Sequence, residues 1–450
     1  MSTVEEMPAE AIPARPVHAP ARVPIHALRR PTIAERYIAV REQSERLCEP
    51  LEIEDFVVSS MPDVSPTKWH LAHTSWFFET FVLREHDPSY RSPDPRYAFL
   101  FNSYYLQAGE RHCRAKRGLV TRPTVQGVFA YRAHVDAAMR RLIEHIGEDA
   151  AHPATALVEL GLNHEQQHQE LLVTDIKHVL WTNPLRPVYR ERVTERRADT
   201  PVRWCAVAEG IHEIGHSGNG FAFDNEAPRH RVFLEPFRLA SRLVTNREYL
   251  QFIEDGGYRR PELWLSAGLA AAQDRDWEAP LYWTRTDGQW TEFTLGGTRA
   301  LAGFALDEPV CHLSYYEADA FARWSGHRLP TEFEWEVAAA SSPVDGPFVE
   351  AERFHPGPAA GPDGLTFEQL YGDAWQWTQS AYVAYPNYRP ESGAIGEYNG
   401  KWMADQWVLR GASCATPRSH ARLTYRNFFP SDARWQFTGI RLASGPEDQG

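Results

Sequence analysis

Hydrophobic residues recur at helical spacing through the first part of the chain, from about residue 32 to residue 182. After Pro123, apolar side chains return every three or four residues, which places them on one helix face: Val128, Tyr131, Val135, Met139 and Leu142. Similar patterns predict further helices near 33–40, over 69–84 and over 153–178. Long helices joined by loops are typical of a four-helix bundle.

The pattern changes beyond residue 200. Strand-like runs at 231–233 and 408–410 are short and lie among many Gly, Asn, Asp and Trp residues. Only 245–254 and 315–325 have a clear helical pattern, and 12 of the 15 tryptophans lie in this part of the chain. This texture predicts a loop-rich α+β domain with an aromatic core, so the fold class is multidomain, α and α+β.

The chain therefore divides into four predicted parts. Residues 1–30 are rich in Pro and Ala without periodicity, and we expect a disordered tail there. Residues 31–182 form the predicted bundle. Residues 183–200 contain prolines and several arginines, which suits an interdomain linker. Residues 201–450 form the second domain.

Charge and cysteine content limit the classes of partner. The formal net charge is −13, which disfavours nucleic acid and anionic membranes as partners, because both require a basic face. No apolar run approaches the length of a membrane span, and the N-terminus lacks the apolar stretch of a secretory signal. The five cysteines are dispersed and include no CxxC, which is typical of reduced thiols in a cytoplasmic protein.

The most specific chemical feature is the pair His164 and His168. Residues four apart on a helix share a face, so both imidazoles can bind one metal ion. A third ligand is available from His70 or His73, which lie on another predicted helix of the bundle. Three neutral imidazoles leave open metal positions and suit Fe(II), Zn(II) or Ni(II). The alternative is that His164 and His168 are ordinary surface or core residues that bind no metal.

The segment 164–168 also matches HExxH, the signature of zinc proteases in which Glu165 would act as the general base. The extended form of that signature requires a glycine and a third histidine shortly afterwards. Those positions hold Leu171 and Thr174, which disfavours a protease.

Three strings in order resemble the sulfoxide synthases of ergothioneine biosynthesis (the EgtB family), and related ovothiol synthases share them. They are SPTKWHLAHTSWFFE at 65–79, FNSYY at 101–105 and HEQQH at 164–168. This N-terminal part is similar to a DinB-type four-helix bundle.

The second domain resembles the formylglycine-generating-enzyme (sulfatase-modifying factor) fold, which is C-type-lectin-like. The matching strings are NEAPRH at 225–230, VTNREY at 244–249, RLPTEFEWE at 328–336, GDAWQW at 372–377, RGAS at 410–413 and GIR at 439–441. Cys414 stands where that family often has Trp, and no matched pair of active-site cysteines is present. The resemblance therefore implies a scaffold that closes over the bundle's metal.

The resemblance implies a non-haem Fe(II) enzyme with His73, His164 and His168 as ligands. Such an enzyme uses O2 to join the sulfur of cysteine, or of a cysteine-containing thiol, to the imidazole of Nα-trimethylhistidine (hercynine), leaving a sulfoxide. The Asn-Ser-Tyr-Tyr string resembles the branch that uses free cysteine and places its catalytic tyrosines at Tyr104 and Tyr105. A neutral tyrosine hydroxyl is a suitable proton donor in a dry site.

Several residues are candidates for substrate binding. Gln167 lies between the two helix histidines and can hydrogen-bond the substrate imidazole. A carboxylate needs a forked cation, for which Arg114, and second Arg117, are the candidates. In the string 425–429, which resembles the family's substrate-binding turn, Asn427 is a candidate contact to the amino-acid part and Phe428 a packing surface for the trimethylammonium group.

Other functions stay open at this stage. The same histidines would serve a 5-histidylcysteine sulfoxide synthase of the ovothiol type, or a zinc- or nickel-dependent DinB hydrolase or thiol transferase. A non-catalytic protein with a lectin-like second domain is a third class. The chain ends without the methyltransferase domain that ovothiol synthases often carry, which favours the ergothioneine side. The motifs leave free cysteine or γ-glutamylcysteine, and hercynine or histidine, as alternatives.

Overall fold

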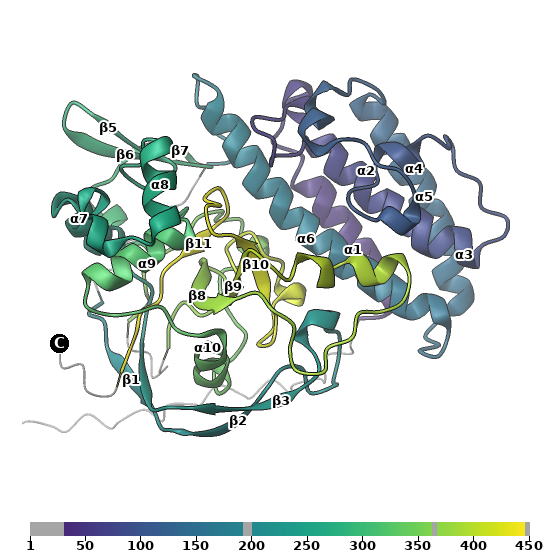
Figure 1. Ribbon diagram of the computed structural model, residues 1–450. Helices are drawn as coiled ribbons and strands as arrows, with labels where there is room; N and C mark the ends of the chain where they lie inside the picture. Colours follow the sequence, from purple (N-terminus) through teal and green to yellow (C-terminus); the bar gives the residue numbers. More distant parts are fainter. Residues whose placement is uncertain (1–30, 192–199, 362–366, 446–450) are drawn as a thin grey trace, which may run out of the picture.

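A computed structural model describes residues 31–191, 200–361 and 367–445, which form two domains packed side by side (Figure 1). The first domain is helical, and its four long helices pack on one another as predicted. They are α1 (Ile33–Arg46), α2 (Thr67–Phe78), α5 (Val125–Ile146) and α6 (Pro153–Thr182). The predicted tail, 1–30, lies outside the described residues.

Local sequence signals set the ends of these helices. Thr124 caps α5, where its hydroxyl accepts from the amide of Gly127 at 3.0 Å. Pro153 occupies the first turn of α6, where its missing N–H costs nothing. The helix predicted over 69–84 is not a single α-helix, because a π-helical turn at Glu79–Leu83 separates α2 from the short α3 (Arg84–His86). Another short helix, α4 (Tyr97–Leu100), follows.

The second domain contains small sheets connected by long loops. Three strands pair in the order β1-β4-β12, four in the order β10-β9-β8-β11, three in the order β5-β6-β7, and β2 pairs with β3. All pairs are antiparallel except β11 with β8. The strands are β1 (Trp204–Val207), β2 (Gly210–Ile214), β3 (His230–Leu234), β4 (Phe237–Ala240), β5 (Trp283–Thr286), β6 (Gln289–Thr294), β7 (Gly297–Ala300), β8 (Trp375–Ala381), β9 (Gln406–Arg410), β10 (Asn427–Pro430), β11 (Thr438–Gly439) and β12 (Ala443–Ser444).

Two of its helices match the predicted ones, and two were missed. The helices α7 (Asn246–Glu254) and α9 (Tyr315–Trp324) lie where the pattern indicated. The missed helices are α8 (Ser266–Asp274) and α10 (Glu332–Ala339). In α10 the acidic side chains Glu332, Glu334 and Glu336 are buried together with Trp335, so no polar face alternates with an apolar one. Arginines from other segments pair with these carboxylates.

Aromatic side chains fill the core of the second domain, as predicted. Trp335, Trp375 and Trp377 are almost fully buried. Their indole N–H groups all find acceptors, which buried indoles require. Trp335 donates to Gln376 Oε1 (2.7 Å) and Trp377 to the carbonyl of Leu313 (2.9 Å).

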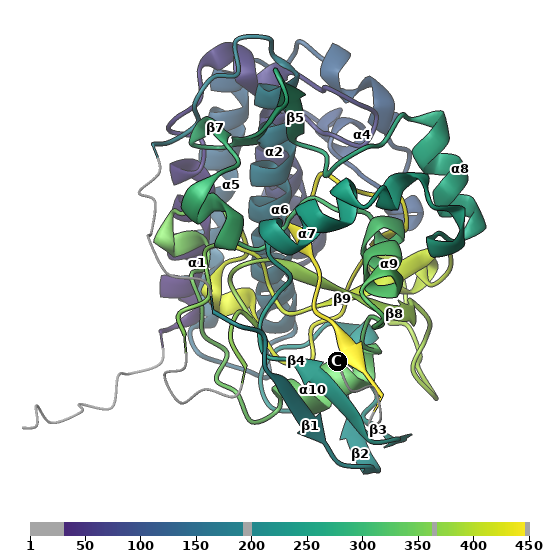
Figure 2. The ribbon, with the colours of Figure 1, turned by 90° about the vertical axis from the view of Figure 1, so that its left-hand side faces the viewer.

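The long helix α6 runs along the second domain, as the two views show (Figure 1, Figure 2). From it, the Lys177 ammonium reaches His312 Nε2 at 2.7 Å, and the Glu170 carboxylate accepts from Trp375 Nε1 at 2.7 Å. Tyr189, in the described part of the predicted linker, joins both domains, because its hydroxyl donates to Leu47 O (2.6 Å) and its amide to Leu295 O (2.9 Å). No helix within the described residues has the length and apolarity needed to cross a bilayer.

Candidate metal centre and substrate cavity

Three histidines from two bundle helices converge at the interface of the two domains. His73 comes from α2, while His164 and His168 lie one turn apart on α6. One ring nitrogen from each lies within 4.8 Å of the other two, and the Nε2 atoms of His73 and His164 are 3.1 Å apart. Metal–nitrogen bonds of about 2 Å place neighbouring ligand atoms about 3 Å apart, so this spacing fits one ion.

The outer nitrogens of two of these rings are held by hydrogen bonds that fix the tautomer. His73 Nδ1 donates to the carbonyl of Phe101 at 2.6 Å, which leaves Nε2 unprotonated for a metal. His168 Nδ1 lies 2.9 Å from Nδ1 of His70, and His70 Nε2 lies 3.0 Å from Asp175 Oδ2. With Asp175 accepting from His70, His70 accepts from His168, whose Nε2 is then free to bind a metal.

The environment keeps these imidazoles neutral, as metal ligands must be. Burial lowers the pKa of His164 to about 3. Burial, followed by the neighbouring histidines, lowers the pKa of His73 and of His168 well below its usual value. The ring of His164 is held by packing, because its centroid lies 4.5 Å from that of the Phe77 ring. Neutral nitrogens with free lone pairs, converging within bonding distance of one point, fit a three-histidine metal centre with open positions.

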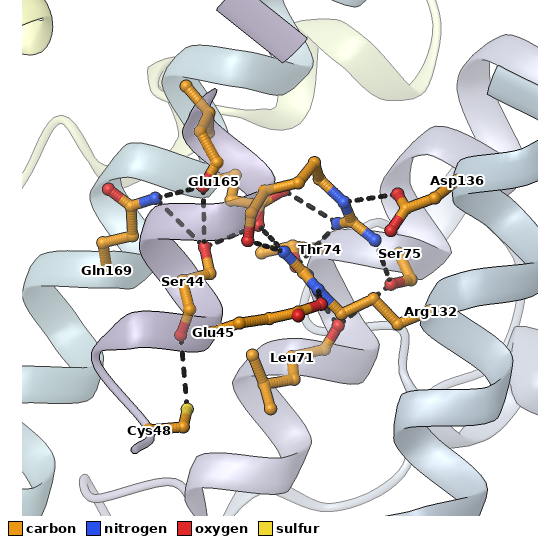
Figure 3. A network of polar contacts seen from close by, with 12 residues as sticks. Ser44, Glu45, Cys48, Leu71, Thr74, Ser75, Arg132, Asp136, Glu165 and Gln169 are labelled. Atoms are coloured by element: carbon orange, nitrogen blue, oxygen red, sulfur yellow. Dashed lines mark hydrogen bonds and ion pairs between the residues drawn. The ribbon is translucent and has the colours of Figure 1, made fainter. Parts of the chain in front are cut away.

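The Glu165 side chain lies inside the bundle, among polar side chains of α1 and α5 (Figure 3). Its Oε1 accepts from Ser44 and from Arg132, both at 2.6 Å, and its Oε2 accepts from Arg41 at 2.8 Å. Burial opposes its ionisation, but the two arginines hold its pKa at about 2. A carboxylate fixed in this way serves the bundle's structure, so the zinc-protease interpretation of HExxH does not fit.

Tyr104 and Tyr105 lie on the loop between α4 and the single 3₁₀ turn Leu106–Ala108. Their rings stack with centroids 4.5 Å apart, and their hydroxyl oxygens are 3.5 Å apart. Tyr105 is fully buried, and burial raises the pKa of both phenols above the usual value. Both hydroxyls therefore carry their protons at neutral pH.

A cavity of about 150 Å³ lies between α6 and the second domain. Gln167 and Asn427, both predicted as substrate contacts, line it together with Tyr425 and Phe429. Gln167 Nε2 donates to the Tyr425 hydroxyl at 2.6 Å, and the Gln167 carbonyl accepts from the Tyr398 hydroxyl. The structure thus brings two predicted contacts, one from each domain, to the same cavity.

The structure places Phe428 away from this cavity. Neighbouring residues of a strand point to opposite faces, so Phe428 is on the far side of β10 from Asn427 and Phe429. Its ring stacks on Tyr382 with centroids 4.1 Å apart, within the second domain. The apolar side chain of this turn that lines the cavity is Phe429.

The two candidate arginines differ sharply. Arg114 is exposed, and its guanidinium donates to the carbonyl of Asp63 at 2.6 Å. Arg117 is buried and lies over the ring of Trp69, 3.4 Å from its centroid, while Trp69 stacks on the ligand ring of His73. Arg117 Nη1 donates to Ser65 Oγ, but its Nε has no acceptor among the described residues. A buried guanidinium with an unused donor suits an incoming carboxylate.

Tyr398 and Tyr425 complete the site, and neither is among the residues predicted from the sequence. The Tyr398 ring lies 5.7 Å from His164 and 6.5 Å from Tyr105. Tyr398 lies beside short 3₁₀ turns with no periodic pattern, so no local signal marks it. Tyr425 lies in the segment 425–429, in which Asn427 and Phe428 are the predicted contacts.

Residues 36–172 match the DinB superfamily, and residues 190–360 match the sulfatase-modifying factor enzyme 1-like domain. A hercynine oxygenase of Mycolicibacterium smegmatis is 31% identical, over 92% of this chain and 99% of that protein. A hercynine oxygenase of Mycobacterium tuberculosis is also 31% identical, over 85% of this chain and 91% of its own length. A formylglycine-generating enzyme of Streptomyces coelicolor is 27% identical over 57% of this chain.

Proposed function

Because the chain belongs to the hercynine oxygenase family, we propose that it is an iron(II)- and O2-dependent sulfoxide synthase acting on hercynine and cysteine in ergothioneine biosynthesis. In this reaction the thiol R–SH, the imidazole C–H and O2 give the sulfoxide R–S(=O)–imidazole and one water. One S–C bond forms, the S–H and C–H bonds break, and the O–O bond is split between sulfoxide and water.

The observation that carries this proposal is the three-histidine centre, together with a cavity lined by both domains that includes Gln167, the residue before His168. Iron(II) held by His73, His164 and His168 would supply open positions for a thiolate and for O2, together with the electrons that activate O2. Asp175, through His70, orients His168, and Phe101 O orients His73.

In this proposal, Gln167 and Asn427 hold the acceptor substrate. The Gln167 amide lies between the two α6 ligands in sequence and is fixed by Tyr398 and Tyr425, so it can present a hydrogen-bonding group to an imidazole. Phe429 gives the cavity an aromatic side, which suits a trimethylammonium group. Holding the imidazole carbon near the thiol sulfur is itself a large part of the catalysis.

Arg117 binds the thiol substrate in this proposal. Its buried guanidinium stacks on Trp69, which in turn stacks on the ligand His73, and it suits the carboxylate of cysteine. Tyr104 and Tyr105 supply the proton that water formation requires, because both hydroxyls are protonated at neutral pH.

The test is O2 uptake by the Fe(II)-loaded protein with cysteine and hercynine, with the product mass read in the same sample. We expect uptake that requires both substrates, and a product equal to their sum plus one oxygen minus two hydrogens. Histidine and γ-glutamylcysteine, substituted in turn, rank the acceptor and the thiol. Zn(II)- and Ni(II)-loaded protein should be inactive. Activity of the zinc form without O2 would overturn the proposal.

A further inference from the structure

The loop that carries Tyr104 and Tyr105 is a preorganised unit. Its buried Asn102 donates to the carbonyls of Tyr105 (2.9 Å) and Gly109 (3.1 Å) and accepts from the amide of Tyr105 (3.1 Å). These bonds close the loop on itself from within. The loop is therefore held together internally, and its position relative to the metal centre depends on its contacts with other segments.

One anchor is at the metal centre. The carbonyl of Phe101, the residue before Asn102, accepts from Nδ1 of the ligand His73 at 2.6 Å. This bond ties the start of the loop to helix α2. At the tip, the buried Tyr105 ring adds packing to this anchor, with ring centroids 5.6 Å from Trp76 and 5.2 Å from Phe81.

The other anchor comes from the second domain, nearly 300 residues later in the sequence. The Glu397 carboxylate accepts from two successive amides of the loop, Leu106 (3.0 Å) and Gln107 (2.9 Å). Lys401, four residues further on, donates to the carbonyl of Tyr104 and pairs with Glu397 at 2.9 Å. The Lys401 ammonium also lies 4.7 Å from the centre of the Tyr104 ring.

The contacts of Glu397 with the loop are not explained by a need to satisfy buried polar groups. Leu106 and Gln107 are exposed, so water could replace the carboxylate at their amides without leaving an unpaired donor. What water cannot replace is the fixed distance between the loop and the segment that carries Tyr398. Tyr398, next to Glu397, reaches Gln167 and the face of His164.

We infer that Glu397 and Lys401 are positioning residues that set the tyrosine hydroxyls relative to the metal centre, so that O2 is used for C–S coupling rather than for oxidation of the thiol alone. The inference rests on the proposed function. The competing reaction, R–SH + O2 → R–SO2H, needs no imidazole and adds both oxygen atoms to sulfur. A loop that leaves its place would favour this outcome.

The variants are Glu397→Gln and Lys401→Met. Glutamine has one acceptor oxygen in place of two, so one amide bond and the ion pair with Lys401 are lost with almost no change in volume. Lys401→Met removes the contact to the Tyr104 carbonyl and keeps the length of the side chain. Matched controls are Glu110→Gln and Lys116→Met, which make the same chemical changes at exposed positions of the same region.

Two measurements are made on the full-length Fe(II)-loaded protein. Hydrogen exchange at the amides of Leu106 and Gln107 should be about tenfold faster in Glu397→Gln, the size expected for losing a hydrogen bond to a charged group. The ratio of sulfoxide to sulfinic acid, at saturating cysteine and hercynine, should fall about tenfold in both variants. Iron content and the unfolding midpoint should match those of the controls, and Lys401→Arg should restore the ratio.

An unchanged product ratio in both variants, with or without faster exchange, would overturn the inference, and so would unchanged exchange in Glu397→Gln. If Glu397→Gln does not fold, Lys401→Met decides by the product ratio alone. Failure of the proposed function is distinguishable, because the unsubstituted protein would then make no sulfoxide with any thiol.

Discussion

His70 and His168 face each other through their Nδ1 atoms at 2.9 Å, and the far nitrogen of His70 reaches the carboxylate of Asp175. The three side chains form a relay from a buried carboxylate to a proposed metal ligand. Each step fixes which nitrogen carries the proton, so the relay presents the lone pair of His168 to the metal. The relay explains why 65–79 contains two histidines when only His73 belongs to the ligand cluster.

Breaking this relay should weaken metal binding without removing a ligand. We expect His70→Phe to lower the affinity for Fe(II) about 10- to 100-fold, the usual effect of losing such an outer partner. Competition with a chelator of known affinity measures the change. The control is His134→Phe, on the exposed face of α5, which should bind Fe(II) as the unsubstituted protein does. Equal affinities for the two variants would contradict the relay.

Replacing both Tyr104 and Tyr105 by phenylalanine should leave Fe(II) binding intact and shift O2 use toward oxidation of the thiol. The physical reason is that the two protonated hydroxyls are lost while the stacked rings remain. The measurement is the ratio of sulfoxide to sulfinic acid by mass. An unchanged sulfoxide yield would exclude these tyrosines as the proton donors.

Arg117 and Arg114 should behave differently, although the sequence favoured Arg114. We expect Arg117→Gln to raise the KM for cysteine about 10- to 100-fold, because a charge-assisted hydrogen bond to the carboxylate is lost. The KM for hercynine should change little. Arg114→Gln is the matched control, since its exposed guanidinium donates to a backbone carbonyl, that of Asp63. Equal KM values for cysteine in the two variants would remove Arg117 from the thiol site.

Glu165 should contribute to stability and not to metal chemistry. Removing its charge in Glu165→Gln leaves Arg41 and Arg132 buried with a missing partner, which should cost about 3–5 kcal/mol of unfolding free energy at pH 7. Urea unfolding measures this loss. The iron content of the folded fraction should stay that of the unsubstituted protein, which a ligand or general base would not allow.

The same contribution should depend on pH in a defined direction. The pKa of Glu165 falls from 4.5 to about 2 on folding, so the stabilisation is complete above pH 4.5 and is lost as pH falls toward 2. The difference in unfolding free energy between the unsubstituted protein and Glu165→Gln should therefore shrink by about 3 kcal/mol over that interval. A difference that stays constant from pH 7 to pH 2 would contradict this assignment.

Local sequence patterns predicted the structure correctly where all the residues involved lie on one helix. The spacing of His164 and His168 places both on one face of α6, because four residues make about one turn. The same reasoning located α1 and α5, since each buries one face against the rest of the bundle, whereas α2 is buried on all sides. It failed for α10, whose buried glutamates pair with Arg328 just before the helix and with Arg410 and Arg426, which are distant in the sequence.

What the sequence determined by itself was the two-domain organisation, the histidine cluster as a set of candidates and the family resemblance of the ordered motifs. The spacing left His70 and His73 open and the family resemblance implied His73, which the structure places in the cluster. Only the tertiary structure brought Arg117 inward while Arg114 stayed exposed, and turned Phe428 away from the cavity. It alone joined Glu397 to the loop of Tyr105. These features depend on contacts between segments that are far apart in the chain. The local spacing of residues does not determine which of two nearby side chains makes such a contact.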